Sequence, residues 1–183
     1  MQVICISGKA QHGKDTTANE IKRQLMENKP CRVLITHYAD LVKYVCRTFF
    51  DWDGKKDEHG RSLLQEIGTD RMREKNPDYW VCFIVSILSL KDFWDYVLIP
   101  DCRFPNEIEI MKARFNTTCV RVVRYTDETN TTVFENNLTE KQRNHPSETS
   151  LDSYDFDSYI DNPGTEDGLR QAVSKWIKEN IYE

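Results

Sequence analysis

A short segment near the N-terminus constrains the fold more than any other feature of this chain. Residues Gly8–Thr16 read GKAQHGKDT, which has the spacing G-x-x-x-x-G-K. The apolar run Gln2–Ser7 before it is typical of a buried parallel strand, and Ala18, Ile21 and Leu25 after it recur at helical spacing. The two glycines allow a tight turn in which successive N–H groups point at one anion, beside the positive end of the helix. The segment therefore predicts a loop that binds phosphate.

The residues at the end of this loop indicate which phosphates it binds. Lys14 follows the second glycine, where an ammonium group can reach the β- and γ-phosphates of ATP and neutralise charge that shifts during transfer. A Ser or Thr usually comes next and binds Mg²⁺ through its hydroxyl, but here the next residue is Asp15, so the Asp15 carboxylate or the Thr16 hydroxyl is the candidate ligand. The alternative is a strand–helix turn that binds no ligand. The residues that this prediction assigns to ATP are Gly8, Lys9, Ala10, Gln11, His12, Gly13, Lys14, Asp15, Thr16 and Thr17.

The rest of the chain alternates between strand-like and helix-like patterns. Apolar runs predict further strands at Arg32–Thr36, Tyr96–Asp101, Cys119–Arg124 and Tyr159–Asp161. Apolar residues at helical spacing predict helices at Leu41–Phe50, Arg61–Lys75, Tyr79–Leu90, Pro105–Phe115 and Leu169–Ile177. Strands that alternate with helices form parallel βαβ units, so we expect an α/β fold in which a parallel five-stranded sheet lies between two layers of helices. We expect residues 1–183 to form a single domain.

One long segment, Asp127–Pro146, is polar, rich in Asn and without clear periodicity. Loops of this length in compact domains tend to be functional, and kinases close such a segment over ATP to expel water. We therefore predict a lid at about residues 127–146, with Arg143 stabilising charge on the moving phosphoryl group and Arg124 contacting the nucleotide at the hinge. The alternative is a charged surface loop.

Composition excludes several other classes of protein. The net charge is −5, from 25 basic and 30 acidic side chains, and no basic stripe is evident, so we expect no nucleic-acid partner. The six cysteines are scattered without a Cys-x-x-Cys pair, which favours reduced thiols over a disulfide framework. No apolar run approaches the length of a membrane span, and the N-terminus lacks the features of a signal peptide. We expect a cytoplasmic protein with no membrane partner.

The loop Ser7–Asp15 has the form S-G-K-x-x-x-G-K-D, and further blocks of sequence accompany it. These blocks are Tyr38–Lys43, Leu64–Asp70, Tyr79–Val81, Ile99–Arg103, Val122–Arg124, His145–Glu148 and Ile160–Gly164. In this order the blocks resemble the bacteriophage-type deoxynucleoside monophosphate kinases, with a more distant likeness to animal phosphomevalonate kinase. The resemblance covers nearly the whole chain. It implies a P-loop NTPase fold of the nucleoside monophosphate kinase type, with ATP and Mg²⁺ as cofactors and a deoxynucleoside monophosphate as acceptor.

The block Ile99–Arg103 places charged residues where an apolar strand ends, which is where ligands gather in open α/β sheets. By the resemblance, Asp101 would act near the metal, and Arg103 and Glu107 would contact the acceptor nucleotide. An arginine suits this role because its planar fork binds phosphate in a bidentate manner. The alternative for Asp101 and Arg103 is a salt bridge at the end of a strand.

Other residues are predicted to complete the acceptor site. Lys43 would lie near the acceptor phosphate by the resemblance, and a solvated lysine is the alternative. Gln65 and Thr69 offer hydrogen bonds to a base or sugar, and Trp80 offers a face for stacking, although packing explains these residues nearly as well. Arg73 lies one helical turn beyond Thr69 and matches an arginine in part of the family.

Three functions remain open at this point. The first is an ATP-dependent deoxynucleoside monophosphate kinase, which we favour. The second is a kinase of another small phosphorylated metabolite such as phosphomevalonate, and the third is a nucleotide-binding regulator without turnover. The sequence leaves open which base is preferred, whether deoxyribose is distinguished from ribose, and whether the chain forms a homodimer.

Overall fold

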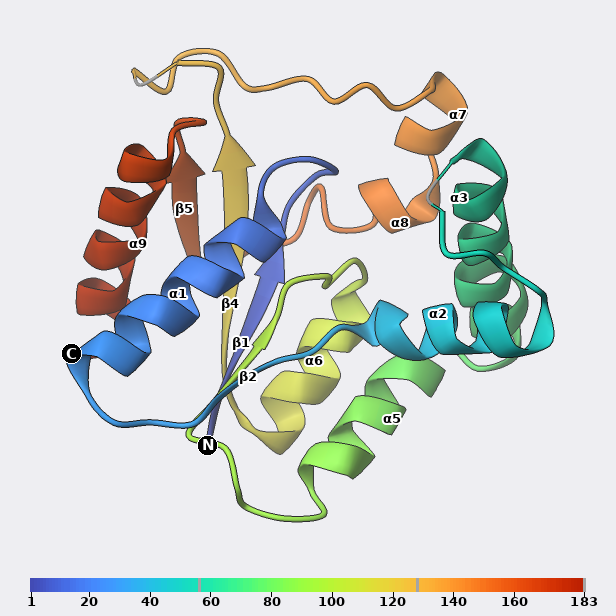
Figure 1. Cartoon of the computed structure of the whole chain (residues 1–183), viewed down its shortest axis with the longest axis horizontal. Coiled ribbons are helices and arrows are strands. Elements are labelled where there is room, and N and C mark those ends of the chain that lie inside the picture. The colour runs from blue at the N-terminus through green and yellow to red at the C-terminus, as the bar shows by residue number, and fades with distance from the viewer. Residues whose placement is uncertain (56, 128, 183) are drawn as a thin grey trace.

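The central feature of the computed structural model is a sheet of five parallel strands (Figure 1). The model describes residues 1–55, 57–127 and 129–182. The strands are β1 (Gln2–Ser7), β2 (Val33–Ile35), β3 (Tyr96–Ile99), β4 (Asn116–Arg124) and β5 (Ser158–Asn162). Their order across the sheet is β2-β3-β1-β4-β5, and every pairing is parallel. The predicted parallel five-stranded sheet is therefore confirmed.

Helices cover both faces of this sheet (Figure 1). On one face lie α1 (Lys14–Asn28) and α9 (Glu166–Asn180), and on the other lie α2 (Tyr38–Phe49), α5 (Tyr79–Leu88) and α6 (Pro105–Arg114). The remaining helical segments are α3 (Glu58–Gln65), the π-helix η1 (Glu66–Arg71), α4 (Met72–Lys75), α7 (Glu140–Arg143) and α8 (Pro146–Thr149). Among the described residues, no helix combines the length and apolarity needed to cross a membrane.

The core is divided by the sheet because successive side chains of a strand point to opposite faces. In β1, Val3 and Cys5 join the cluster beneath α2, α5 and α6, whereas Ile4 and Ile6 pack with α1 and α9. All four are completely buried, which explains why β1 is an unbroken apolar run. Burying a large apolar side chain contributes about 1.5–3 kcal/mol, so the two clusters together fix the position of the loop that follows β1.

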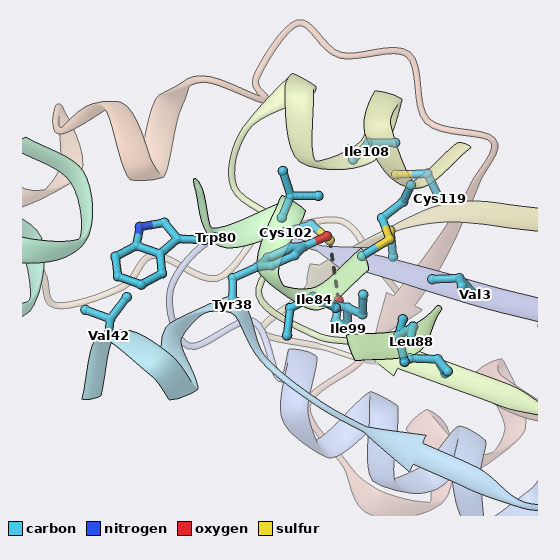
Figure 2. Close-up of a cluster of buried hydrophobic side chains, with 14 of the residues drawn as sticks. Val3, Tyr38, Val42, Trp80, Ile84, Leu88, Ile99, Cys102, Ile108 and Cys119 are labelled. Atoms are coloured by element: carbon cyan, nitrogen blue, oxygen red, sulfur yellow. Dashed lines mark hydrogen bonds between the residues drawn. The ribbon is translucent and has the colours of Figure 1, made fainter. Parts of the chain in front are cut away.

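Figure 2 shows the cluster on the α2–α5–α6 face, where Tyr38 and Val42 of α2 lie beside Trp80 of α5. Trp80 is 2% exposed, and its indole Nε1–H donates a hydrogen bond to the main-chain carbonyl of Gly68 at 2.8 Å. This contact connects α5 to η1, which forms a wall of the candidate site described below.

The stretch Arg61–Lys75, predicted to be helical, is helical along its whole length, but the helix starts earlier and is not regular. The helix begins at Glu58 and widens into a π-helix over Glu66–Arg71. The wide turn coincides with Gly68, which packs closely against Val42 and gives its carbonyl to Trp80. Local periodicity contains no trace of these contacts between distant residues.

The predicted start of α2 at Leu41 is also wrong, because the helix begins at Tyr38. The N–H groups of Tyr38 and Ala39 donate to the two carboxylate oxygens of Asp101, at 3.0 and 2.9 Å. A helix needs such partners for its first N–H groups. Here a residue more than 60 positions away supplies two of them, and these two contacts could not be predicted from the local sequence.

Other boundaries differ by a few residues. Strand β4 begins at Asn116 rather than Cys119, and the predicted Phe115 lies in extended backbone just past the end of α6. Helix α5 ends at Leu88, two residues before the predicted Leu90. Strands β2 and β3 are shorter than predicted, and β5 is longer.

The predicted lid contains more regular structure than its sequence suggests. Tyr125 forms an antiparallel bridge with Val133, and α7 begins after Thr139, whose hydroxyl accepts from the N–H of Gln142. Between these elements the chain runs extended across the top of the molecule (Figure 1). Glu128, within the predicted lid, lies outside the described residues.

Candidate active site

The loop between β1 and α1 requires glycine at two positions. Gly8 has φ +150°, and a β-carbon there would lie 2.6 Å from the carbonyl oxygen of Val122. Gly13 has φ +88°, and a β-carbon there would lie 2.6 Å from Nδ2 of Asn162. Gly13 is also the N-cap of α1 and provides no side-chain hydrogen bond to the helix N–H groups. The start of α1 is therefore arranged as helix N-termini are when they bind an anion.

Lys14 is held inside this loop. Its Nζ donates to the carbonyl oxygens of Gly8 and Lys9, at 2.8 and 2.9 Å. Burial lowers the pKa of Lys14 to about 8, and the positive charge of Arg103 acts in the same direction. Because an added anion would favour the charged form, phosphate binding would raise this pKa again.

His12 connects the loop to the strand end and to the predicted lid. Its Nδ1 accepts a hydrogen bond from the N–H of Arg124, and its Nε2 donates to the carbonyl of Phe134, both at 3.2 Å. Burial is the main cause that lowers the pKa of His12. Since Nδ1 accepts, the ring proton lies on Nε2, and the imidazole connects the end of β4 to Phe134 in the segment that follows.

Arg124, predicted to contact the nucleotide, lies against the same loop. Its Nη1 donates to the carbonyl of Gln11 at 3.2 Å, and its guanidinium stacks on the ring of Phe134 at 4.5 Å. The extended segment reaches the loop as well, since the N–H of Asn137 lies 3.5 Å from Oε1 of Gln11. The predicted hinge and the start of the predicted lid are thus in contact with the predicted ATP loop.

Two of the candidate metal ligands, Asp15 and Asp101, are hydrogen-bonded to different parts of the chain. Asp15 is exposed and bonds Nε2 of His37 at 2.7 Å, and this bond is the main cause that raises the pKa of His37. Both carboxylate oxygens of Asp101 accept hydrogen bonds from N–H groups at the start of α2. Burial raises the pKa of Asp101. Asp15 and Asp101 both act to raise the pKa of Lys14, so their charges reach the same ammonium.

These residues fit a metal ion that takes most of its ligands from water and from substrate phosphates. In residues 1–55, 57–127 and 129–182, no three His, Cys, Asp or Glu side chains gather as a ready-made metal site. Mg²⁺ usually keeps several waters and binds one or two carboxylates together with substrate phosphates. Thr16 is exposed, whereas the buried hydroxyl of Thr17 has no hydrogen-bond partner among the described residues. Asp15, Asp101 and Thr16 thus remain predicted ligands for Mg²⁺.

A cavity of about 240 Å³ lies beside the loop, at the carboxyl ends of β1 and β3. The loop contributes Ala10, and the segment after β3 contributes Asp101 and Phe104. All residues predicted to bind the acceptor line this cavity: Lys43, Gln65, Thr69, Arg73, Trp80, Arg103 and Glu107. The structure therefore brings together side chains from α2, α3, η1, α4, α5 and α6.

Arg73 and Glu107 form a buried ion pair in the wall of the cavity. The guanidinium of Arg73 also stacks on the ring of Phe104 at 4.1 Å. The second oxygen of Glu107 accepts from the N–H groups of Arg103 and Phe104, at 2.6 and 3.0 Å. Glu107 thus holds the turn that carries Arg103, in addition to its predicted contact with the acceptor. Burial raises its pKa, and Arg73 acts in the opposite direction.

The other acceptor residues differ in how they are held. Nζ of Lys43 donates to Asp40 at 2.9 Å, which leaves this cation at the mouth of the cavity. Gln65 and Thr69 are half-buried on α3 and η1. The indole N–H of Trp80 donates to the carbonyl of Gly68, so Trp80 offers the cavity an apolar surface rather than a hydrogen-bond donor.

Arg143 stands apart from these residues. It is exposed on α7, and within the described part of the chain its side chain makes no hydrogen bond or ion pair and does not line the cavity. Leu138 and Gln142 of the same segment do line it. The predicted role of Arg143 therefore requires α7 to move toward the loop.

Three residues of this site have no role in the prediction from sequence: Glu148, Asn162 and His37. Glu148 pairs with Arg103 and accepts from the N–H of Ala10, and Asn162 donates to the carbonyl of His12 at 3.1 Å. His37 bridges Asp15 and Asp40, at 2.7 and 3.2 Å. Glu148 and Asn162 lie in blocks that carry the family resemblance, which was the signal that could have identified them.

Comparison with known proteins supports the fold. The sequence matches no protein-family model and no curated protein. Among solved structures, a shikimate kinase from Aquifex aeolicus vf5 aligns over 100% of this chain and 99% of its own, with 14% identity and a TM-score of 0.52. A shikimate kinase from Bacteroides thetaiotaomicron aligns over 97% of both chains, with 12% identity and a TM-score of 0.50. Together with the strand order, this likeness shows a P-loop NTPase fold of the nucleoside monophosphate kinase type.

Proposed function

We propose that this chain is a P-loop kinase that transfers the γ-phosphoryl group of ATP to a deoxynucleoside 5′-monophosphate. One observation carries the proposal: the loop predicted to bind ATP borders a cavity that is lined by cationic side chains. Ala10 belongs to the loop and also lines the cavity, as Arg103 does. A donor phosphate in the loop and an acceptor phosphate in the cavity would therefore meet.

The chemistry of this transfer needs little more than positioning and charge. The acceptor phosphate is already an oxyanion at neutral pH, so no strong general base is required. Lys14 would neutralise charge on the donor phosphates, while Lys43, Arg73 and Arg103 would hold the acceptor. Asp15, Thr16 and Asp101 would hold Mg²⁺ directly or through water, and the ion would supply positive charge that offsets the negative charge of the donor phosphates.

The shape and polarity of the cavity support a nucleotide as the acceptor. Val42, Leu64 and Trp80 supply apolar surface for a base, and Gln65 and Thr69 supply an amide and a hydroxyl for its edge. Ligand sites are typically apolar with a few convergent polar groups. The resemblance to deoxynucleoside monophosphate kinases agrees with this arrangement, and the likeness in fold to two shikimate kinases agrees with phosphoryl transfer to a small molecule.

The proposal is tested by measuring ATP consumption with a panel of acceptors. The panel contains the ribo- and deoxyribonucleoside monophosphates, shikimate and mevalonate phosphate. We expect turnover with at least one deoxynucleoside monophosphate and loss of turnover in Lys14→Met. Turnover with mevalonate phosphate alone would assign the acceptor to another class, and ATP binding without turnover for any acceptor would indicate a regulator.

A further inference from the structure

Glu148 lies where the donor loop meets the acceptor cavity. Its side chain is 8% exposed. Oε2 accepts a hydrogen bond from the N–H of Ala10 at 3.1 Å, and Oε1 pairs with Nη1 of Arg103. These partners lie 138 and 45 residues away along the chain. A single carboxylate therefore contacts one group of each predicted phosphate site.

Among the described residues, the guanidinium group of Arg103 is hydrogen-bonded through Nη1 alone. Nη1 donates to Glu148 and to the carbonyl of Ser147, the latter at 3.0 Å. Nε and Nη2 make no hydrogen bond within the described part of the chain, and the side chain lines the acceptor cavity. A guanidinium binds phosphate best through two parallel N–H groups, and Nε with Nη2 is such a pair. Fixing Nη1 leaves this pair for a ligand and restricts the plane in which it lies.

The segment that carries Glu148 is attached to the loop by a second, independent contact. Nζ of Lys9 donates to the main-chain carbonyl of Glu148 at 2.6 Å and pairs with Asp152 at 2.5 Å. These contacts do not involve the Glu148 side chain. Removing that side chain should therefore free the N–H of Ala10 and leave the guanidinium of Arg103 with only its hydrogen bond to the carbonyl of Ser147, while α8 stays in place.

We propose that Glu148 is a positioning residue. Its carboxylate fixes the guanidinium of Arg103 at a set position relative to the main-chain N–H of Ala10. The acceptor phosphate bound by Arg103 would then face the phosphate held by the loop. This inference rests on the proposed phosphotransferase function. Transfer requires reacting atoms about 3–3.5 Å apart, and a displacement of about 1 Å can cost 10²-fold in rate.

The test is a double-mutant cycle on the full chain, with ATP and the nucleoside monophosphate that the wild type turns over best. Glu148→Ala is expected to lower kcat/KM for the acceptor by about 10²-fold. Glu148→Gln keeps one acceptor oxygen for Arg103 and is expected to recover part of this loss. If Glu148 acts through Arg103, the double variant Glu148→Ala, Arg103→Ala is no slower than Arg103→Ala alone. The inference is overturned if the reductions in kcat/KM from Glu148→Ala and Arg103→Ala multiply in the double variant. It is also overturned if Glu148→Ala binds the acceptor more tightly than the wild type.

Asp152→Ala is the matched control, because Asp152 contacts Lys9 of the loop but not Arg103. In the double variant Asp152→Ala, Arg103→Ala, the two single-variant reductions in kcat/KM are expected to multiply. A readout without turnover separates this inference from the proposed function. The guanidinium N–H signals of Arg103 in nitrogen-15 NMR should report slow rotation in the wild type and in Asp152→Ala, and fast rotation in Glu148→Ala. Equal rotation in all three proteins refutes the positioning role, whereas a wild type that phosphorylates no acceptor refutes only the proposed function.

Discussion

The side-chain amide of Asn162 donates to the main-chain carbonyl of His12 at 3.1 Å, and its Nδ2 would lie only 2.6 Å from a β-carbon on Gly13. The same asparagine accepts from the N–H of Gly164 at 3.0 Å, so the end of β5 is bonded directly to the phosphate loop. The loop therefore depends on a residue near the other end of the chain for its shape.

This relationship predicts the effect of Gly13→Ala. The new β-carbon would meet Nδ2 of Asn162 at 2.6 Å, at a residue whose φ is +88°. We expect the free energy of unfolding to fall by about 1–3 kcal/mol and ATP affinity to fall with it, measured by urea denaturation and calorimetry. Gly54→Ala is the control, since Gly54 has φ +92° but its β-carbon would meet only the end of the Arg47 side chain. Wild-type ATP affinity in Gly13→Ala would contradict the assignment of the loop.

Lys14→Met should abolish turnover yet stabilise the protein without nucleotide. The pKa of Lys14 is about 8 in the folded state, against an ordinary value of 10.5, so below pH 8 the folded state bears the full cost of the buried charge. The variant should exceed the wild type in free energy of unfolding by up to about 3 kcal/mol at pH 7.

The pH dependence of this difference provides the check. Between pH 8 and 10.5 the folded wild type releases the Lys14 proton while the unfolded chain retains it, so the cost fades and the two proteins converge. Chemical denaturation of both proteins at pH 7, 8 and 9.5 measures the gap. A gap that stays constant would show that the ammonium is not destabilised by burial.

Arg143→Ala tests the predicted lid. Because Arg143 is exposed and its side chain makes no hydrogen bond or ion pair among the described residues, we expect no change in thermal stability. If the arginine reaches the moving phosphoryl group, kcat should fall by about 10³-fold or more while ATP affinity changes little. Lys141→Ala, on the same helix, is the control and should keep most of the activity. A wild-type kcat in Arg143→Ala would remove this residue from catalysis.

Trp80→Phe tests the contact between α5 and η1. The substitution keeps an aromatic ring but leaves the carbonyl of Gly68 without its indole donor. We expect a loss of about 1–3 kcal/mol in the free energy of unfolding, and a higher KM for the acceptor because the wall of the cavity loosens. Trp94→Phe, at a half-buried site away from the cavity, should leave KM unchanged. An unchanged KM in Trp80→Phe as well would separate η1 from acceptor binding.

The parts of this fold that follow local rules were predictable from sequence. The unbroken apolar run of β1 indicated a strand buried on both faces, and the glycine spacing that follows it indicated the loop. The contacts of Asp101 with the start of α2 were not predictable, because Asp101 follows the neighbouring strand β3 and is distant in sequence. The π-helical turn was not predictable either, because its wide turn meets Val42 and Trp80 rather than its own neighbours in sequence.

The same distinction applies to the candidate site. The residues predicted to bind the acceptor all line one cavity, but the sequence gives no account of what holds them there. The part played by Glu148 depends on α8 folding back onto Ala10 and Arg103, and no spacing in the sequence encodes that approach. The family resemblance marks the position of Glu148 in the sequence, but its contacts with Ala10 and Arg103 are seen only in the structure.

The π-helix Glu66–Arg71 has a consequence for how such a protein can diversify. Each residue advances a regular helix by about 100°, so deleting one residue here would rotate Thr69 and the residues after it by about that angle. The wall that meets the acceptor would then present different side chains, while the glycine loop and its lysine would be untouched. A change of chain length at this turn is therefore a route by which descendants of one ancestor could acquire new acceptors without rebuilding the machinery for ATP.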